Sequence, residues 1–164
     1  MYALSNMLGS VTYMYGNRMV FENGKIVTLD PSELFTGVPD RPDHARGFMW
    51  DEGFHNHLIS VWNIDLTQEI ISSWFAQASD NGWICREQML GQEIRSGAPP
   101  SSWPQIESNA NPPSQHLLLS DLLDRFESPD YEDLYADKYD GFVDFLGLIY
   151  DNFKNNVEWF LTSQ

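Results

Sequence analysis

Residues 46–55 read RGFMWDEGFH, and residues 81–93 read NGWICREQMLGQE. Both stretches combine aromatic rings with carboxylates and an arginine. The flat face of an aromatic ring stacks against the C–H face of a sugar, while carboxylates and guanidinium groups hydrogen-bond its hydroxyls in fixed geometry. This combination indicates a carbohydrate ligand.

A third motif, ANPP at residues 110–113, follows the first two. In this order the three motifs resemble the processing α-glucosidase I group of glycoside hydrolase family 63, the mannosyl-oligosaccharide glucosidases. Weaker similarity runs from residues 3–9 and 34–39 to about Gln115. The sequence departs from the family pattern at residues 41–45 (RPDHA) and 94–99 (IRSGAP), which suggests a divergent relative.

The resemblance implies an all-α fold that forms part of an α/α toroid, the six-hairpin glycosidase barrel. Family members carry a catalytic toroid much longer than 164 residues. We therefore expect residues 1–164 to be a fragment of one toroid domain, with no linker or second domain. The implied reaction of the whole enzyme is inverting removal of the terminal α-1,2-linked glucose from the N-glycan precursor in the endoplasmic reticulum.

The resemblance also implies the substrate-binding positions. Trp50, Asp51 and Glu52 would line the pocket for the terminal glucose, with Asp51 accepting hydrogen bonds from sugar hydroxyls. Without the resemblance, two adjacent acids are better explained as a helix start, because they interact favourably with the helix dipole. The full set of implied substrate-binding residues is Phe48, Trp50, Asp51, Glu52, His55, Trp83, Arg86, Glu87 and Glu93.

The second stretch supports this set only if it is helical. On a helix, Trp83, Arg86 or Glu87, and Leu90 or Glu93 recur at three- to four-residue steps and share one face. Alternatively, Arg86 and Glu87 form surface ion pairs that contribute little energy. The local pattern alone does not choose between the two.

No catalytic pair is assigned within the chain. Inverting glycosidases need one carboxylic acid for the leaving oxygen and one carboxylate to activate water. The family resemblance implies that the acid lies in a later SG(L/M)DDYPR stretch and the base nearer the C-terminus, and neither occurs here. Residues 128–131, SPDY, resemble the SG(L/M)DDYPR stretch only superficially. We expect both catalytic residues outside this chain.

Composition restricts the partners. Nine basic against 24 acidic residues give a net charge of −15, which disfavours nucleic acid and anionic membranes. The expected partner is a glucosylated high-mannose oligosaccharide or glycoprotein, with no cofactor. Membrane attachment is expected only through a segment absent from this chain, because Asn17 and Arg18 interrupt the apolar N-terminal stretch and nothing resembling a secretory signal precedes the match.

Cysteine and histidine usage does not indicate a metal site. The single cysteine, Cys85, excludes an internal disulfide, and a buried inert thiol is favoured over one activated by Arg86. His55 and His57 stand two apart, whereas zinc ligands on one helical face are four apart. A supporting or solvated histidine is the better interpretation.

Hydrophobic spacing predicts the remaining elements. We expect a helix over Tyr2–Tyr15, helices over Phe54–Val61 and Leu66–Ala78 with Asp65 as a cap, and a long loop over Asp30–Ala45. A β-hairpin is predicted near residues 19–29, and Gly97–Pro113 reads as an irregular docked loop. Helices are predicted over Ser114–Phe126 and Gly141–Leu161, separated by an acidic, solvated stretch.

Two other classes of function remain open. The chain could be a non-catalytic glycan-binding or degenerate relative that keeps the pocket wall without the catalytic acid and base. Alternatively, it could be an acidic helical interaction module in which the aromatic residues only form the core. Sugar titration separates this last class from the others, because an interaction module shows no saturable sugar binding.

Overall fold

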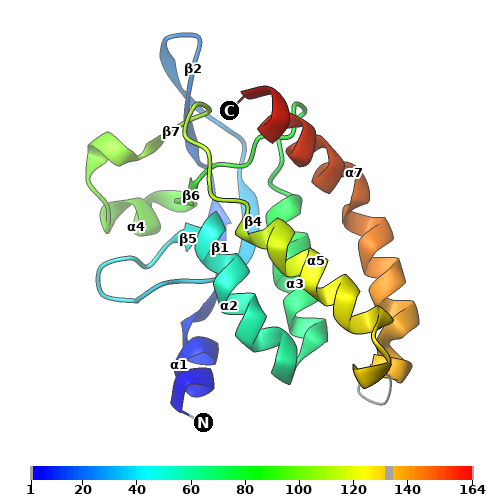
Figure 1. Ribbon diagram of the computed structural model, residues 1–164. Helices are drawn as coiled ribbons and strands as arrows, with labels where there is room; N and C mark the ends of the chain where they lie inside the picture. The colour runs from blue at the N-terminus through cyan, green and yellow to red at the C-terminus, as the bar shows by residue number, and fades with distance from the viewer. Residues whose placement is uncertain (1, 132–134, 164) are drawn as a thin grey trace.

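The computed structural model describes residues 2–131 and 135–163. Four helices run side by side on one side of the molecule: α2 (Met49–Trp62), α3 (Ile64–Phe75), α5 (Ser114–Glu127) and α7 (Tyr139–Ser163). The short strands and α4 (Gly91–Ser96) lie on the other side, and α1 (Tyr2–Ser10) lies near one end of α2 (Figure 1). Helix α3 is central, because it packs against α2, α7 and strand β4 (Ser32–Gly37).

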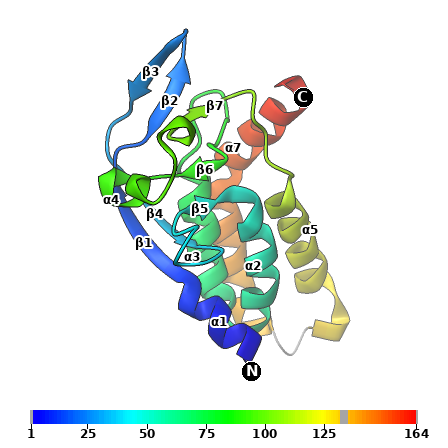
Figure 2. The ribbon, with the colours of Figure 1, turned by 90° about the vertical axis from the view of Figure 1, so that its left-hand side faces the viewer.

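Three small sheets complete the described fold. Strand β1 (Val11–Gly16) pairs antiparallel with β4, and β5 (Gly47–Phe48) pairs antiparallel with β6 (Glu87–Gln88). Strand β2 (Met19–Glu22) pairs antiparallel with β3 (Lys25–Thr28) and parallel with β7 (Pro104–Ile106). The β2–β3 hairpin projects from the body of the molecule (Figure 2). This confirms the hairpin predicted near residues 19–29.

The hydrophobic core lies between the four long helices and the β1–β4 ribbon. Fully buried side chains from each layer meet there: Leu34, Ile59, Ile70, Ile71, Trp74, Phe75, Leu118 and Leu122. A second, smaller cluster lies under β2 and the end of α7 and contains Val20, Trp83, Cys85 and Trp159. Residues 81–93 contribute to both clusters, with Ile84 and Leu90 in the main core and Trp83 and Cys85 in the second.

The prediction of an all-α fold is wrong in detail, although the chain is mostly helical. The helix predicted over Tyr2–Tyr15 ends at Ser10, and β1 continues the chain. In β1 the side chains alternate, with Met14 buried and Tyr13 and Tyr15 exposed. That period of two, in a stretch rich in β-branched and aromatic residues, fits a strand paired to β4 better than a helix.

Two segments predicted as loops also contain strands. The stretch Asp30–Ala45 includes β4, in which Leu34 and Thr36 are buried against α3. The stretch Gly97–Pro113 is docked as predicted, but it contains β7 and the 3₁₀ helix η1 (Pro100–Ser102). Proline density therefore identified docked segments without excluding short strands.

The helical predictions hold better for the C-terminal part. Helices α5 and α7 confirm the predictions over Ser114–Phe126 and Gly141–Leu161, each slightly longer than expected. The connection between them includes two short 3₁₀ helices, η2 (Pro129–Tyr131) and η3 (Ala136–Lys138). Its acids Glu127, Asp130, Asp137 and Asp140 are exposed as predicted, whereas Glu132 and Asp133 lie outside the described residues.

Helices α2 and α3 both begin at a different residue from the one predicted. Helix α2 begins at Met49 rather than Phe54, so the Trp-Asp-Glu triplet forms its first turn. Helix α3 begins at Ile64, and its cap is Asn63 rather than Asp65, because the Asn63 side chain accepts a hydrogen bond from the Leu66 amide at 3.0 Å.

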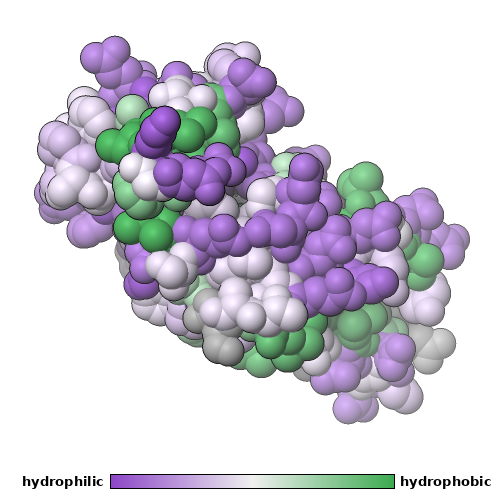
Figure 3. Space-filling view, turned by 90° about the horizontal axis from the view of Figure 1, so that it is seen from above, coloured by the Kyte–Doolittle hydropathy of each residue, from purple (hydrophilic) through white to green (hydrophobic). Residues whose placement is uncertain are grey.

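Within the described ranges, no helix is long and apolar enough to cross a membrane. Seen from above, the surface is largely hydrophilic with separate hydrophobic patches (Figure 3).

Candidate substrate-binding site

Residues 46–55 and 81–93 meet through the short β5–β6 ribbon. Gly47 faces Gln88 and Phe48 faces Glu87 in this pair. The ladder is extended at the helix start, where the Met49 amide donates to the Arg86 carbonyl oxygen at 3.1 Å. Backbone pairing therefore brings Arg86 and Glu87 beside the first turn of α2.

The third motif contacts the same turn of α2, because the Asn111 side-chain amide donates to the Met49 sulfur at 3.6 Å. The two residues after the motif add to this: the Ser114 hydroxyl donates to the Trp50 carbonyl oxygen at 2.5 Å, and the Gln115 amide donates to the Met49 carbonyl oxygen at 3.0 Å. At Gly53 a Cβ atom would lie 2.4 Å from the Ser114 carbonyl carbon, so only glycine permits this approach of α5. All three motifs thus converge on the N-terminus of α2.

The two adjacent acids of α2 occupy different environments. Glu52 has no exposed surface. Its Oε1 atom accepts from the Thr36 hydroxyl at 2.9 Å and lies 3.2 Å from Nδ1 of His55, and its Oε2 atom accepts from the Asn56 amide at 2.8 Å. The Thr36 oxygen in turn accepts from the Trp74 indole N–H at 3.0 Å. Glu52 therefore links α2 directly to β4 through Thr36, and indirectly to α3 through the bond between Thr36 and Trp74.

Asp51 and His55 are both half-buried at the surface of the same turn. Burial raises the pKa of Asp51, and the negative charge of Glu52 adds to this, while His55 and Arg86 oppose it. Burial lowers the pKa of His55, but the hydrogen bond to Glu52 and the charges of Glu52 and Asp51 outweigh burial, so its pKa lies above the ordinary value of 6.5. The two groups therefore interact electrostatically.

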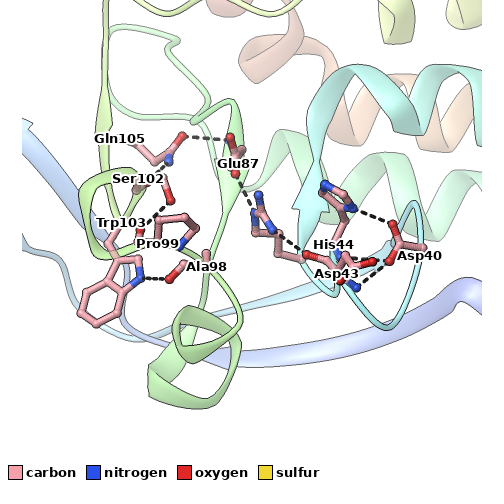
Figure 4. Close-up of polar contacts among 10 residues, drawn as sticks. Asp40, Asp43, His44, Glu87, Ala98, Pro99, Ser102, Trp103 and Gln105 are labelled. Carbon is pink, nitrogen blue, oxygen red and sulfur yellow. Dashed lines mark hydrogen bonds and ion pairs between the residues drawn. The ribbon is translucent and has the colours of Figure 1, made fainter.

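Glu87 is held by neighbouring groups. Its carboxylate pairs with Arg46, with Nε and Oε2 2.6 Å apart, and its backbone amide donates to Gln105 at 2.9 Å. The Arg46 guanidinium also lies over the Phe48 ring, 4.7 Å from its centroid. Figure 4 shows Glu87 and Gln105 on one side of the view and Asp40, Asp43 and His44 on the other.

The Asp40–His44 loop is ordered by one carboxylate. Asp40 accepts from the backbone amides of Asp43 and His44 and pairs with the His44 ring at 2.6 Å (Figure 4). The hydrogen bond from the Asp43 amide, followed by that from the His44 ring, lowers the pKa of Asp40. The His44 ring lies 6.0 Å from the Phe48 ring, so this loop borders the same surface.

The prediction that residues 83–93 present one helical face is wrong. The chain is extended through β6, and helix α4 starts only at Gly91, whose φ of +81° favours glycine. Trp83 is buried in the second cluster, whereas Glu93 is exposed in the first turn of α4. Arg86 is exposed and acts electrostatically on Asp51.

Cys85 confirms the interpretation as an inert thiol. Its side chain is buried in the second cluster, and burial raises the pKa of the thiol to about 11. Arg18, rather than Arg86, is the arginine whose charge opposes that shift.

Several residues that hold the site together were not predicted. Thr36 and Asn56 donate to the buried Glu52, Trp74 donates to Thr36, and Ser114 donates to the first turn of α2. Asn56 could have been found, because it stands four residues after Glu52 on the same helical face. Thr36, Trp74 and Ser114 are distant in sequence and carry no local signal.

The candidate site is partly exposed, with Arg86 exposed and Phe48, Trp50 and Asp51 half-buried. A groove of about 950 Å³ lies elsewhere, between β4, α3 and α7, and its lining residues include none of the predicted substrate-binding set. Within residues 2–131 and 135–163, no three His, Cys, Asp or Glu side chains group as metal ligands. The predicted residues that lie near the first turn of α2 and keep some exposure are Phe48, Trp50, Asp51, His55, Arg86 and Glu87.

Comparison with known proteins identifies the same family as the sequence motifs. The family described as "Glycosyl hydrolase family 63 C-terminal domain" matches residues 1–164. The chain is 37% identical to an alpha-glucosidase 2 of Arabidopsis thaliana over 99% of this chain and 21% of the relative. A mannosyl-oligosaccharide glucosidase of the same plant shows 37% identity over 99% of this chain and 20% of the relative.

A yeast relative agrees with the plant proteins. The mannosyl-oligosaccharide glucosidase of Saccharomyces cerevisiae is 41% identical over 74% of this chain and 16% of its own length. The chain thus spans about a fifth of the length of the curated relatives that it matches.

Proposed function

Because the chain belongs to glycoside hydrolase family 63, we propose that the surface at the N-terminus of α2 binds a glucose residue of an oligosaccharide. The observation that carries this proposal is the convergence of three motifs, distant in sequence, on one helix turn. A turn that only started a helix would not need Arg86 and Glu87 from a separate strand. The exposed chemistry there suits a sugar.

Each exposed residue has a distinct role in the proposed complex. The Asp51 carboxylate accepts hydrogen bonds from sugar hydroxyls, and the exposed Arg86 guanidinium donates to them. The half-buried rings of Phe48 and Trp50 supply flat apolar faces for the C–H face of the sugar. Glu52 and Glu87 support this surface through the internal bonds described above, whereas Trp83 and Glu93 stand apart from it.

For the whole enzyme we propose inverting hydrolysis of the terminal α-1,2-linked glucose of the N-glycan precursor in the endoplasmic reticulum. The names of the matched relatives support an oligosaccharide glucosidase. In this proposal the chain is one part of an α/α-toroid catalytic domain, and the general acid and base lie outside these 164 residues. The chain spans only about a fifth of the length of its relatives, so in the whole enzyme another segment can supply the opposite wall of the site.

The experiment that tests the proposal is a titration of the 164-residue protein with methyl α-D-glucoside, followed by amide NMR. The proposal predicts saturable shifts at residues 48–51 and at Arg86. Methyl α-D-mannoside, which differs from the glucoside only in the configuration of the hydroxyl at C2, serves as a matched control and should bind more weakly. Shifts confined to Trp83 and Glu93, or no saturable shift, contradict the assignment.

Catalysis is measured in the same samples. The proposal predicts binding without appreciable glucose release from a glucosylated oligosaccharide, because loss of an acid or base removes orders of magnitude in rate. Rapid glucose release would instead place the catalytic pair among the acids of this chain.

A further inference from the structure

We propose that Glu52 is a positioning residue that acts through His55, holding its ring in one tautomer and setting the charge beside Asp51. The inference rests on the proposed function only where it concerns sugar binding. The Thr36–Glu52–His55 arrangement links β4 to the exposed turn of α2. Glu52 contributes a charge that solvent does not reach directly.

The geometry fixes which ring nitrogen of His55 carries a proton. Nδ1 lies 3.2 Å from Oε1 of Glu52, and a carboxylate oxygen only accepts hydrogen bonds. Nδ1 therefore donates in both charge states of the ring. Nε2 is then an acceptor in neutral His55 and a donor in the imidazolium, so protonation switches this one atom without moving the ring.

The surrounding bonds hold the carboxylate in place. Trp74 donates to the Thr36 oxygen, whose own proton is directed to Glu52 Oε1 or to the Gly37 carbonyl oxygen, each 2.9 Å away. Asn56 donates to the other carboxylate oxygen. A Cβ atom on Gly37 would lie 2.8 Å from His55 Nδ1 and 2.9 Å from Glu52 Oε1, so β4 closes tightly over the pair.

Only two charges act directly on His55 in the described structure. They are those of Glu52 and Asp51, both on α2, and both favour the imidazolium. Thr36 and Gly37, which face the pair from β4, are neutral. Arg86, from the β6 side, acts on Asp51, and His55 in turn favours ionised Asp51. The buried carboxylate is thereby coupled to the exposed one through the imidazole.

This coupling gives the site a pH dependence. A His55 pKa above 6.5 keeps the ring protonated near pH 6.5, and the Nε2 donor and its positive charge are lost as pH rises through the raised pKa. We expect sugar affinity to fall about three- to tenfold across that window, because a charged donor is replaced by a neutral acceptor. The charge of Glu52 sets the pH range over which the affinity falls.

The test is ¹⁵N NMR titration of the imidazole rings in the 164-residue protein, without ligand. In the wild-type protein the inference predicts protonated Nδ1 on His55 and a pKa above 6.5. In Glu52→Gln the pKa of His55 should fall markedly. His57 and His44 pair with other acids, Asp121 and Asp40, so the NMR signals of their rings serve as internal references.

A second variant keeps the inference testable if Glu52→Gln does not fold. In His55→Gln, the pKa of the Asp51 carboxyl, followed by ¹³C NMR, should rise, because the favourable charge is removed. An unprotonated Nδ1 in the wild-type protein, or an Asp51 pKa that His55→Gln leaves unchanged, overturns the inference. So does an unchanged His55 pKa in folded Glu52→Gln.

Titration with methyl α-D-glucoside at several pH values separates this inference from the proposed function. If methyl α-D-glucoside does not bind at any pH while the ring titrations behave as predicted, the proposed function fails and the positioning role stands. If the sugar binds with an affinity that is flat across the titration of His55, the proposed function stands and the pH coupling fails.

Discussion

Residues 46–55 and 81–93 have similar composition, yet they fold differently. The first stretch forms a strand and then a helix whose initial turn is partly exposed. The second stretch contains the short strand β6 and the start of α4, and its tryptophan is buried beside Cys85 and Trp159 in the second cluster. Mixed aromatic and acidic residues therefore stay partly exposed in one case, where we propose the binding surface, and contribute to hydrophobic packing in the other.

The same contrast occurs within a single dipeptide. Asp51 is half-buried at the surface, whereas Glu52 has no exposed surface and is bonded to Thr36, His55 and Asn56. Helical geometry rotates adjacent residues to different faces, so two neighbouring acids need not share a function. A residue type in a motif indicates a chemistry, and the position on the helix decides whether a ligand can reach it.

The largest predicted effect concerns the two tryptophans. Trp83→Ala should destabilise the protein by about 3–5 kcal/mol, because a buried aromatic side chain is removed from the second cluster. Trp50→Ala should cost clearly less, since Trp50 is only half-buried. Urea unfolding of both variants measures the difference. Similar losses in the two variants would remove the contrast between the two stretches.

The next effect concerns the close approach of α2 and α5. Gly53→Ala should destabilise by about 1–3 kcal/mol, because its Cβ would overlap the Ser114 backbone and side chain. Gly147→Ala is the matched control, since nothing lies within 4 Å of its Cβ position in α7. The control should gain up to about 1 kcal/mol from helix propensity. A Gly53→Ala protein as stable as the control would contradict the close approach of α5 to α2 at Gly53.

A smaller effect is expected from pH. His55 has a pKa raised above its unfolded value of 6.5, so its stabilising contribution is fully present below that pH. The contribution is lost as pH rises through the folded pKa. Thermal melts between about pH 6 and 8 should therefore show a steeper loss of stability in the wild-type protein than in His55→Gln.

The exposed His44 provides a control for this measurement. His44→Gln removes an imidazole ring that lies at the surface, where it pairs with Asp40. Its pH profile should remain steeper than that of His55→Gln. Identical profiles for His55→Gln and the wild-type protein would show that the Glu52 contact does not stabilise the folded state.

The sequence predicted the elements that follow from local spacing. Helices α5 and α7 and the β2–β3 hairpin follow from apolar periodicity and from the turn at Asn23-Gly24. The family resemblance, now confirmed, identified the segments that converge at α2. It did not require the local structure of each segment to be known.

The remaining features depend on contacts distant in sequence. Strand β1 forms because β4 pairs with it, and residues 87–88 are extended because β5 pairs with them. The burial of Glu52 depends on Thr36 and on Trp74, whose hydrogen bond holds Thr36. Local propensity contains none of this information, because tertiary context overrides it.

The central claim is that Asp51, and not Glu93, belongs to the sugar-binding surface. Calorimetric titration of methyl α-D-glucoside into Asp51→Asn and Glu93→Gln tests it most directly, with a melting curve for each variant. We predict that Asp51→Asn weakens binding by about 1–3 kcal/mol, because an acceptor-only carboxylate becomes a mixed donor and acceptor. Its melting temperature should stay the same or rise slightly, since burial disfavours the ionised form of Asp51.

Glu93→Gln, at an exposed position on α4, should bind like the wild-type protein. Unchanged affinity in a folded Asp51→Asn protein, or a loss confined to Glu93→Gln, would contradict the account.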